Sequence, residues 1–168
     1  SLPDALFAAD LWEVVQNTAH QDYQDPHRFF TGTYPTTNMK VLLKDVADRL
    51  SGAQGGTSTF RLETGFGGGK THSLIATVHV AREGRNLTAQ LDNYGITRLP
   101  EPGETRVAVF VGENSDPLSG IVHEVEGQQV RTYTPWGQIA LMAGGLAGYE
   151  HVKENDLKGV APSQDALE

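Results

Sequence analysis

A run of glycines near the middle of the chain limits its fold and chemistry more than any other feature. Residues 63–72 read ETGFGGGKTH, so that four glycines occupy the five positions directly before Lys70 and Thr71. Glycines have no Cβ atoms, and their backbone amides can therefore point together at an anion. The lysine adds a mobile positive charge for phosphate groups, and the threonine hydroxyl can bind Mg²⁺. The run therefore predicts a phosphate-binding loop.

The residues on either side of the glycines have the pattern that such a loop requires. Residues 57–63 predict a β-strand that enters the loop, and apolar residues at helical spacing over 74–81 predict a helix that ends at Gly84. The usual spacing places a glycine six positions before the lysine, where this chain has Thr64, and the glycine follows at Gly65. The alternative is a flexible glycine turn beside an unrelated lysine.

The predicted nucleotide-binding residues are the loop and the first turn of the helix after it. They are Gly65, Phe66, Gly67, Gly68, Gly69, Lys70, Thr71 and His72. Amides in a first helical turn attract anions, because the positive end of the helix dipole lies there. Lys70 is the predicted catalytic residue and Thr71 the predicted Mg²⁺ ligand. His72 either contacts phosphate or only packs, since the motif assigns it no chemistry.

The patterns before the loop predict an N-terminal helical segment over residues 1–56 that packs on the core. Apolar residues at helical spacing predict a helix over residues 4–17. A second helix is predicted to begin after a threonine cap at Thr36 or Thr37 and to run to Leu50, where Gly52 ends it.

Residues 57–168 predict a partial nucleotide-binding domain, truncated at its C-terminus because residues 161–168 resemble a helix start. Two alternating runs around Gly127 predict a β-hairpin. Together the elements predict an α/β fold: a P-loop NTPase-like three-layer sheet with helices on both faces, with the N-terminal segment before it and the hairpin as an insertion. The further elements are a buried strand at 106–112, hairpin strands at 121–126 and 129–134, and helices over 135–145 and 149–157.

Composition and charge argue against two classes of partner. Residues 1–100 hold nine basic and ten acidic residues, and residues 101–168 hold four and eleven, so no basic stripe indicates direct binding of nucleic acid. No apolar run approaches the ~18 residues that would cross a membrane. The chain has no cysteine, and its start lacks the pattern of a secretory signal. A cytoplasmic location is therefore expected.

Aromatic residues gather in the sequence before the loop, at Tyr23, Phe29, Phe30 and Tyr34. Aromatic faces stack well on bases, so these residues could form a shelf for adenine. They could instead hold the N-terminal segment against the core, which is the more common role of such residues. Both interpretations stay open at this point.

The chain resembles a family of very large prokaryotic predicted ATPases that is catalogued as a domain of unknown function. Its members are often found beside DNA methyltransferase and phage-defence genes. The resemblance rests on the glycine triplet followed by Lys70, Thr71 and His72, within the stretch LETGFGGGKTHSLIA at 62–76. Further similar stretches lie at residues 7–12, 25–34, 136–140 and 161–163.

The resemblance implies an AAA-like module that binds ATP and Mg²⁺ at the front of a much longer polypeptide. The expected partners are nucleotide and the remaining domains of that polypeptide, and self-association stays open. The acidic strand end of the family has its nearest match in residues 107–113, so Glu113 or Asp116 is either a metal-side carboxylate or part of a turn. Two alternatives are a small-molecule or nucleotide kinase and a non-hydrolysing, nucleotide-dependent interaction module.

Overall fold

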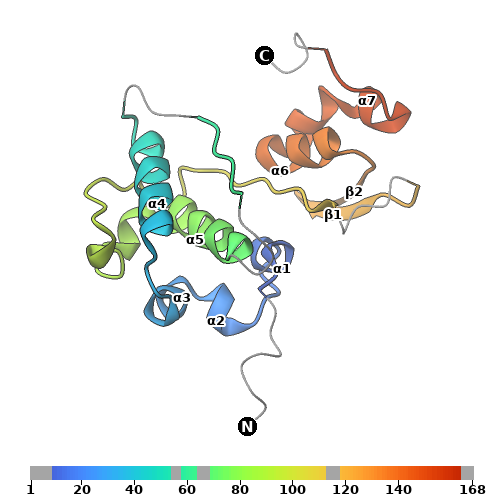
Figure 1. The fold of residues 1–168 in the computed structure, drawn as a ribbon. Coiled ribbons are helices and arrows are strands. Elements are labelled where there is room, and N and C mark those ends of the chain that lie inside the picture. Colours follow the sequence, from blue (N-terminus) through green and yellow to red (C-terminus); the bar gives the residue numbers. More distant parts are fainter. Residues whose placement is uncertain (1–8, 54–57, 64–68, 113–117, 164–168) are drawn as a thin grey trace. The chain divides into compact units, whose positions relative to one another are not determined.

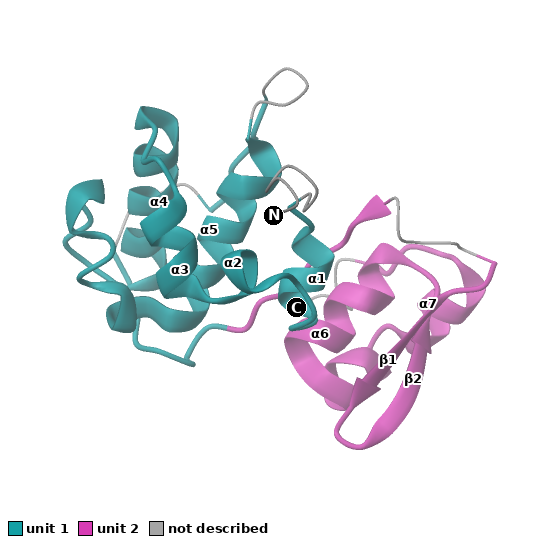
Figure 2. Ribbon diagram, turned by 90° about the horizontal axis from the view of Figure 1, so that it is seen from below, with its two compact units in different colours: residues 1–105 teal, residues 106–168 magenta. Residues whose placement is uncertain are grey.

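The chain separates into two compact units. The computed structural model describes residues 9–53, 58–63, 69–112 and 118–163. Unit 1 covers residues 1–105 and unit 2 covers residues 106–168 (Figure 2). The division predicted between residues 56 and 57 falls inside unit 1.

Unit 1 is built from helices around α5. In chain order they are α1 (Leu11–Val15), α2 (Gln21–Gln24), α3 (Pro26–Gly32), α4 (Thr37–Leu50), α5 (Lys70–Glu83) and the 3₁₀ helices η2 (Gly84–Leu87) and η3 (Asp92–Tyr94). Helices α1, α3 and α4 each contact α5, and Figure 1 shows α4 beside it. The helices predicted before and after the glycine run are confirmed as α4 and α5. Of the helix predicted over 4–17, the described residues show α1 alone.

Short polar side chains begin several of these helices. Asp10 accepts hydrogen bonds from the amides of Trp12 and Glu13 at 2.8 and 3.2 Å, and Thr36 accepts one from the amide of Met39 at 3.3 Å. The first amides of a helix have no partner within it, so a side-chain oxygen at this position satisfies them. The threonine cap predicted for α4 is therefore confirmed at Thr36.

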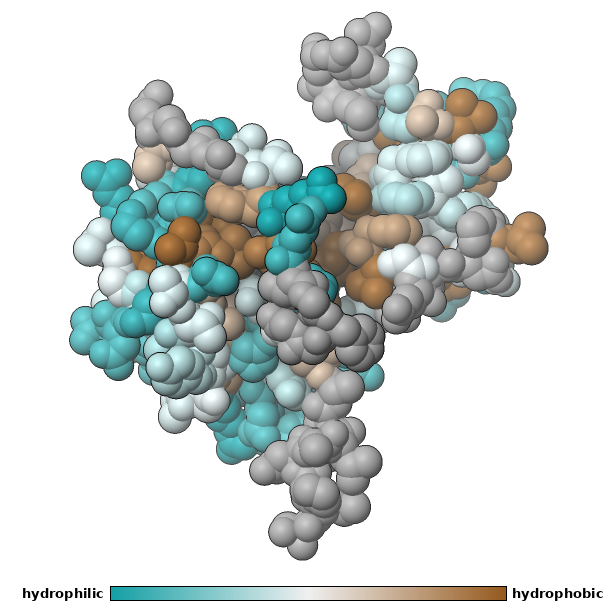
Figure 3. Space-filling model, viewed as in Figure 1, coloured by the Kyte–Doolittle hydropathy of each residue, from teal (hydrophilic) through white to brown (hydrophobic). Residues whose placement is uncertain are grey.

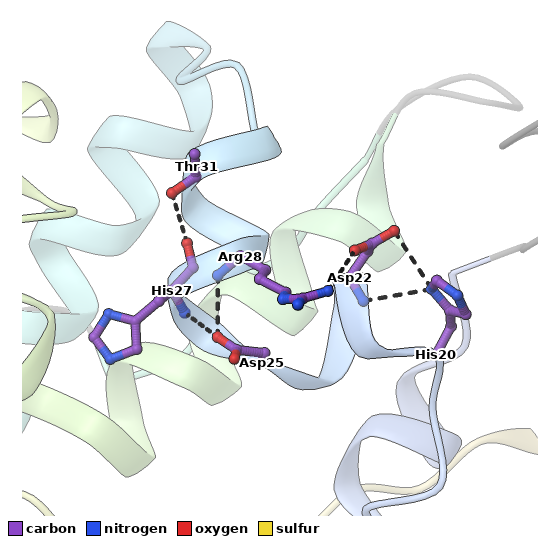
Figure 4. Close-up of polar contacts among 6 residues, drawn as sticks. All are labelled: His20, Asp22, Asp25, His27, Arg28 and Thr31. Carbon is purple, nitrogen blue, oxygen red and sulfur yellow. Dashed lines mark hydrogen bonds and ion pairs between the residues drawn. The ribbon is translucent and has the colours of Figure 1, made fainter.

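A polar cluster surrounds the beginnings of α2 and α3 (Figure 4). Asp25 accepts from the amides of His27 and Arg28 at 2.9 and 3.0 Å, and these bonds, the one from Arg28 above all, lower the pKa of its carboxyl. Asp22 lies 3.5 Å from His20 and 3.9 Å from Arg28, and all three are exposed. Exposed ion pairs contribute little, so this cluster begins helices rather than forming a site.

The core of unit 1 gathers around α5. Arg82 near its end donates from Nη2 to the carbonyl of Val15 at 3.0 Å and from Nη1 to that of Val14 at 3.4 Å. Those carbonyls belong to the last turn of α1, and that of Val14 also accepts from the amide of Asn17 at 3.3 Å. The two bonds from Arg82 therefore hold α1 on α5. The fully buried core residues are Val14, Leu43, Ala47, Ile75, Ala76, Val80 and Leu87.

Unit 2 contains a hairpin followed by helices. Its elements are β1 (Ile121–Val125), β2 (Gln128–Thr132), α6 (Pro135–Glu150) and α7 (Lys153–Lys158). The strands are antiparallel with Val125 opposite Gln128, and Glu126 and Gly127 between them have φ of 53° and 75°. Positive φ at both central residues is the geometry of a tight hairpin turn, which glycine favours. The predicted hairpin is confirmed.

Helix α6 begins and bends where its sequence indicates. Thr134 accepts from the amide of Gly137 at 3.1 Å, and Pro135 takes the first helical position as predicted. The range of α6 joins two helices that meet at Gly145, whose φ of 65° and ψ of −157° are not helical, so the predicted helix end at Gly145 is confirmed. The core of unit 2 is formed by Leu141, Tyr149 and Val152, with Val125, Val130, Trp136, Ala140 and Leu146 packed against it.

The prediction of an α/β fold with a three-layer sheet is wrong. Among the described residues the sheet consists of β1 and β2 only. Residues 58–63 and 106–112, both predicted strands, carry no strand assignment where they are described. An extended run becomes part of a sheet only when another strand takes its hydrogen bonds. The carbonyl of Val109 instead accepts from the side chain of Gln138 at 2.8 Å, and Phe110 is 37% exposed.

The described surface mixes hydrophilic and hydrophobic residues. On the face in Figure 3, hydrophilic residues cover much of unit 1, and hydrophobic residues are visible between them. None of the helices in the described part of the chain combines the length and the apolar character needed to cross a membrane.

Candidate functional site

The predicted phosphate-binding loop ends in a left-handed glycine that leads directly into α5. Gly69 has φ of 75° and ψ of 19° and is exposed, and the amide of Ser73 donates to its carbonyl at 2.9 Å as the first bond of the helix. A glycine has no side chain that could cap the amides of the first turn. Gly65, Phe66, Gly67 and Gly68 lie outside the described residues.

The structure places Lys70, Thr71 and His72 together in the first turn of α5. Thr71 is exposed, whereas Lys70 and His72 are half-buried. The positive end of the helix dipole lies in this turn and favours a nearby anion. A hydroxyl exposed next to such an anion could also bind a cation that accompanies it.

His72 points into the protein and hydrogen-bonds Thr33. Its Nε2 lies 2.8 Å from Thr33 Oγ1, and the same hydroxyl donates to the carbonyl of Phe29 at 2.6 Å. A hydroxyl has one hydrogen, so Thr33 accepts from His72, and the neutral histidine carries its proton on Nε2. His72 therefore joins the first turn of α5 to the end of α3.

Aromatic rings pack around His72 and His79, and we call the set Tyr23, Phe29, Phe30, His72, His79 and Tyr94 the aromatic cluster. The rings of Phe29 and His72 lie 4.5 Å apart at 30°, and those of Phe29 and His79 lie 5.1 Å apart. Phe30 meets Tyr94 at 5.6 Å, edge to face. Such ring pairs add stability beyond the area that they bury.

The aromatic cluster decides between the two roles predicted for the aromatic residues. Phe29 and Phe30 are 2% and 5% exposed and contact other rings, so they hold α3 against α5 and offer no open shelf for a base. Tyr34 is 82% exposed and has no part in the cluster. Packing is therefore the role of Phe29 and Phe30.

The histidines of the aromatic cluster predict that unit 1 loses stability in mild acid. Burial lowers the pKa of both His72 and His79, and the bond from His79 Nε2 to the carbonyl of Tyr23 at 2.7 Å only partly opposes this shift. Their stabilising contribution is complete above the unfolded pKa of about 6.5 and is lost as the pH falls below it. The free energy of unfolding should therefore be lower at pH 5.5 than at pH 7.5.

Urea unfolding of the Trp136→Phe variant measures this effect, because Trp12 then reports on unit 1 alone. His79→Gln should reduce the pH dependence, and the exposed His20→Gln is the matched control that should preserve it. An equal or higher free energy of unfolding at pH 5.5 would contradict the prediction.

The structure does not describe the two acidic residues considered as further Mg²⁺ ligands. Glu113 and Asp116 lie outside the described residues. Among the residues that the structure describes, no group of three histidines and carboxylates could hold a metal ion. Of the candidate Mg²⁺ ligands Thr71, Glu113 and Asp116, Thr71 is the one that lies within the described residues.

The structure also contains buried polar atoms that sequence patterns do not indicate, and two of the four without a hydrogen-bond partner among the described residues lie after α5. Gln90 Oε1 and Tyr94 OH are both buried, and neither has a hydrogen-bond partner among the described residues. Both lie in the irregular stretch after α5, where no periodic pattern marks a side chain as buried. Only the tertiary structure identifies them.

Comparison with known proteins gives one family. The model of the DUF499 N-terminal domain matches residues 2–168, which is nearly the whole chain. No curated protein and no solved structure matches it.

Proposed function

The chain belongs to the DUF499 N-terminal domain family, and from that premise we propose that it binds Mg-ATP through residues 65–72. In this proposal the chain is the nucleotide-binding part of a larger cytoplasmic ATPase that serves phage defence or other DNA-associated work. The observation that carries the proposal is the junction at Gly69, where a left-handed glycine leads directly into a helix that begins with Lys70 and Thr71.

The chemistry of this junction suits a triphosphate. The charge of Lys70 would neutralise the β- and γ-phosphates, and the first-turn amides would add hydrogen bonds and the helix dipole. Thr71, with its exposed hydroxyl, would hold Mg²⁺, which neutralises phosphate charge when bound. The residues present therefore fit the ligand. His72 has a packing role through Thr33, so its contribution would be to orient this turn.

A kinase receives less support from unit 2. A kinase needs basic residues for its acceptor, and residues 101–168 hold only four. Each is engaged within unit 2: Arg106 and Arg131 donate to backbone carbonyls, and Lys153 and Lys158 pair with Glu150 and Glu154. We therefore develop the ATP-binding proposal alone.

Thermal unfolding with excess Mg-ATP tests the proposal. A ligand at about 100 times its Kd stabilises the folded state by about 2.7 kcal/mol. Each kcal/mol raises the Tm by about 4–8 °C for a unit of about 100 residues, the size of unit 1, so the expected shift is large enough to measure. Lys70→Ala should abolish it, because the charge that faces the phosphates is lost.

Matched variants separate binding from a general effect on folding. Lys44→Ala removes an exposed helix lysine that pairs with Asp48 at 2.6 Å, and it should preserve the ATP shift. Thr71→Ala should remove the dependence on Mg²⁺, whereas Thr71→Ser should retain it. An unchanged Tm in the parent chain at millimolar nucleotide would refute the proposal.

Phosphate release distinguishes the ATPase from the interaction module. Turnover by the 168-residue chain that is lost in Lys70→Ala would show that the chain itself hydrolyses ATP. Binding without turnover would favour a module whose hydrolysis depends on other parts of the protein.

A further inference from the structure

A hollow of about 450 Å³ lies in unit 1 between the end of α4, the helix η2 and the stretch 96–99. Its volume falls in the range of about 300–1,000 Å³ that is usual for small-molecule sites. The wall includes Ser51, Arg85, Ile96, Thr97, Arg98 and Leu99. Two of the described lining residues are arginines and none is acidic, so the hollow has the charge of an anion site.

The packing at Gly84 brings the two arginines to one hollow. The carbonyl of Pro100 accepts from the amide of Arg85 at 3.1 Å, and it lies so close to Gly84 that a Cβ there would overlap it. This contact lays the stretch before Pro100 along η2. Arg85 and Arg98 are both exposed, so a ligand that enters from solvent can reach their guanidinium groups.

Neither guanidinium group is held by a strong interaction. Arg98 forms no ion pair within the described part of the chain. Arg85 pairs with Glu101 at 3.0 Å, but the two side chains are 66% and 49% exposed. Such exposed pairs contribute little to stability. An anion in the hollow can therefore bind Arg98 directly and compete with Glu101 for Arg85.

The donors of the hollow suit a phosphate group better than a carboxylate. A guanidinium group offers a planar fork of donors that matches two oxygens of an oxyanion. A phosphate monoester has three terminal oxygens and close to two negative charges at neutral pH, which is enough for two arginines. The side chains of Ser51 and Thr97 form no hydrogen bond within the described residues, so their hydroxyls can donate as well.

The size of the hollow indicates that the phosphate belongs to a larger molecule. A volume of about 450 Å³ exceeds what inorganic phosphate alone would fill. Ile96 and Leu99 add apolar surface to the wall, and Ile96 is only half-buried. A carbon skeleton attached to the phosphate would contact this apolar part.

We propose that this hollow binds a small organic phosphate monoester, with Arg85 and Arg98 on the phosphate and Ile96 against the carbon skeleton. The site goes beyond the ATP-binding function proposed above and does not depend on it. Arg85 follows the end of α5, whereas Lys70 begins that helix. The 14 residues of α5 span about 21 Å, so one phosphate group cannot contact both residues.

Phosphorus NMR titration of the 168-residue chain with phenyl phosphate, at pH 7.5 and constant ionic strength, tests the proposal. The parent should bind phenyl phosphate several-fold more tightly than inorganic phosphate, because the ring contacts Ile96. Arg85→Gln and Arg98→Gln should each weaken binding about 5- to 10-fold, since each removes one fork of donors. Arg28→Gln is the matched control. Arg28 is also exposed and near a carboxylate, at 3.9 Å from Asp22, but it does not line the hollow.

Glu101→Gln tests the competition for Arg85. Removing the carboxylate leaves Arg85 available to the ligand, so phenyl phosphate should bind about 2- to 5-fold more tightly. A purely structural role of the Arg85–Glu101 pair would not tighten binding. The Tm of each variant should stay close to that of the parent, because all of these side chains are exposed.

Three results would overturn the proposal: no binding of phenyl phosphate by the parent, unchanged affinity in both Arg85→Gln and Arg98→Gln, or phthalate bound as tightly as phenyl phosphate. Lys70→Ala separates this site from the nucleotide site. It should abolish the ATP shift in Tm and leave the affinity for phenyl phosphate unchanged. Loss of phenyl phosphate binding in Lys70→Ala would place that ligand at the start of α5 and refute the hollow as its site, while an absent ATP shift in the parent would refute the proposed function alone.

Discussion

Replacing Asp156 by alanine is expected to destabilise unit 2 by about 3 kcal/mol or more. Asp156 is fully buried, and its carboxylate accepts from the amides of Tyr133 and Thr134 and from the hydroxyls of Thr134 and Tyr149. Hydrogen bonds to a charged group contribute about 1.5–3 kcal/mol, and buried donors left without an acceptor cost more. Alanine removes all of these acceptors at once.

The same carboxylate explains why unit 2 holds together. It joins α7 to the end of β2 and to the hydroxyl of Tyr149 near the end of α6, at 2.9 Å. Thr134, which donates to it, is also the cap of α6. Loss of the carboxylate therefore weakens three elements together. The Asp156 bond and burial together raise the pKa of the Tyr149 hydroxyl, with burial the larger cause.

Urea unfolding of the Trp12→Phe variant measures this prediction, since Trp136 then reports on unit 2. Glu154→Ala is the matched control, because Glu154 lies on the same helix with its side chain 80% exposed. It should cost less than about 1 kcal/mol, as expected for a surface ion pair. Equal free energies of unfolding for the two variants would contradict the role given to Asp156.

Gly84→Ala should destabilise unit 1 by about 3 kcal/mol or more. Gly84 follows α5 with φ of 46° and ψ of −121°, a backbone conformation that residues other than glycine rarely adopt. A Cβ at this position would also overlap the backbone carbonyl of Pro100. That carbonyl accepts from the amide of Arg85 at 3.1 Å, so it cannot move away freely. The cost of the strained backbone and the cost of the overlap with Pro100 therefore add in the free energy of unfolding.

Gly95→Ala is the control that separates these two costs. Gly95 also has positive φ, at 69°, but a Cβ there would meet no atom within 4 Å. Only the cost of the left-handed conformation remains, about 1–2 kcal/mol. Thermal unfolding followed by Trp12 fluorescence, in the Trp136→Phe background, compares the two variants. A Gly84→Ala variant no less stable than Gly95→Ala would contradict the close packing of Pro100.

Local signals in the sequence predicted the hairpin and several of the helix limits correctly. Thr36 begins α4, Gly84 ends α5, and Thr134 with Pro135 begins α6, all as expected from capping. Each signal acts within a few residues of the chain. The phosphate-site prediction rests on the same kind of local signal, and the structure places its last residues at the start of α5. Whether nucleotide binds there stays a prediction.

Patterns that depend on distant partners did not predict the structure. Residues 106–112 have the apolar character of a buried strand, but the described residues give them no neighbouring strand. Asp156 has the sequence context of a solvent-exposed acid on a short helix, yet it is the buried centre of unit 2. In both cases the outcome depends on groups that are far away along the chain.

The sequence alone therefore determined where α4 and α6 begin and α5 ends, where the chain reverses at Gly127, and which residues could meet a phosphate. Only the tertiary structure decided which extended runs pair, which carboxylate is buried, and that Arg85 and Arg98 border the same hollow. The physical reason is the range of the interactions. Caps and turns act between near neighbours, whereas strand pairing, burial and cavities depend on contacts that folding creates between distant segments.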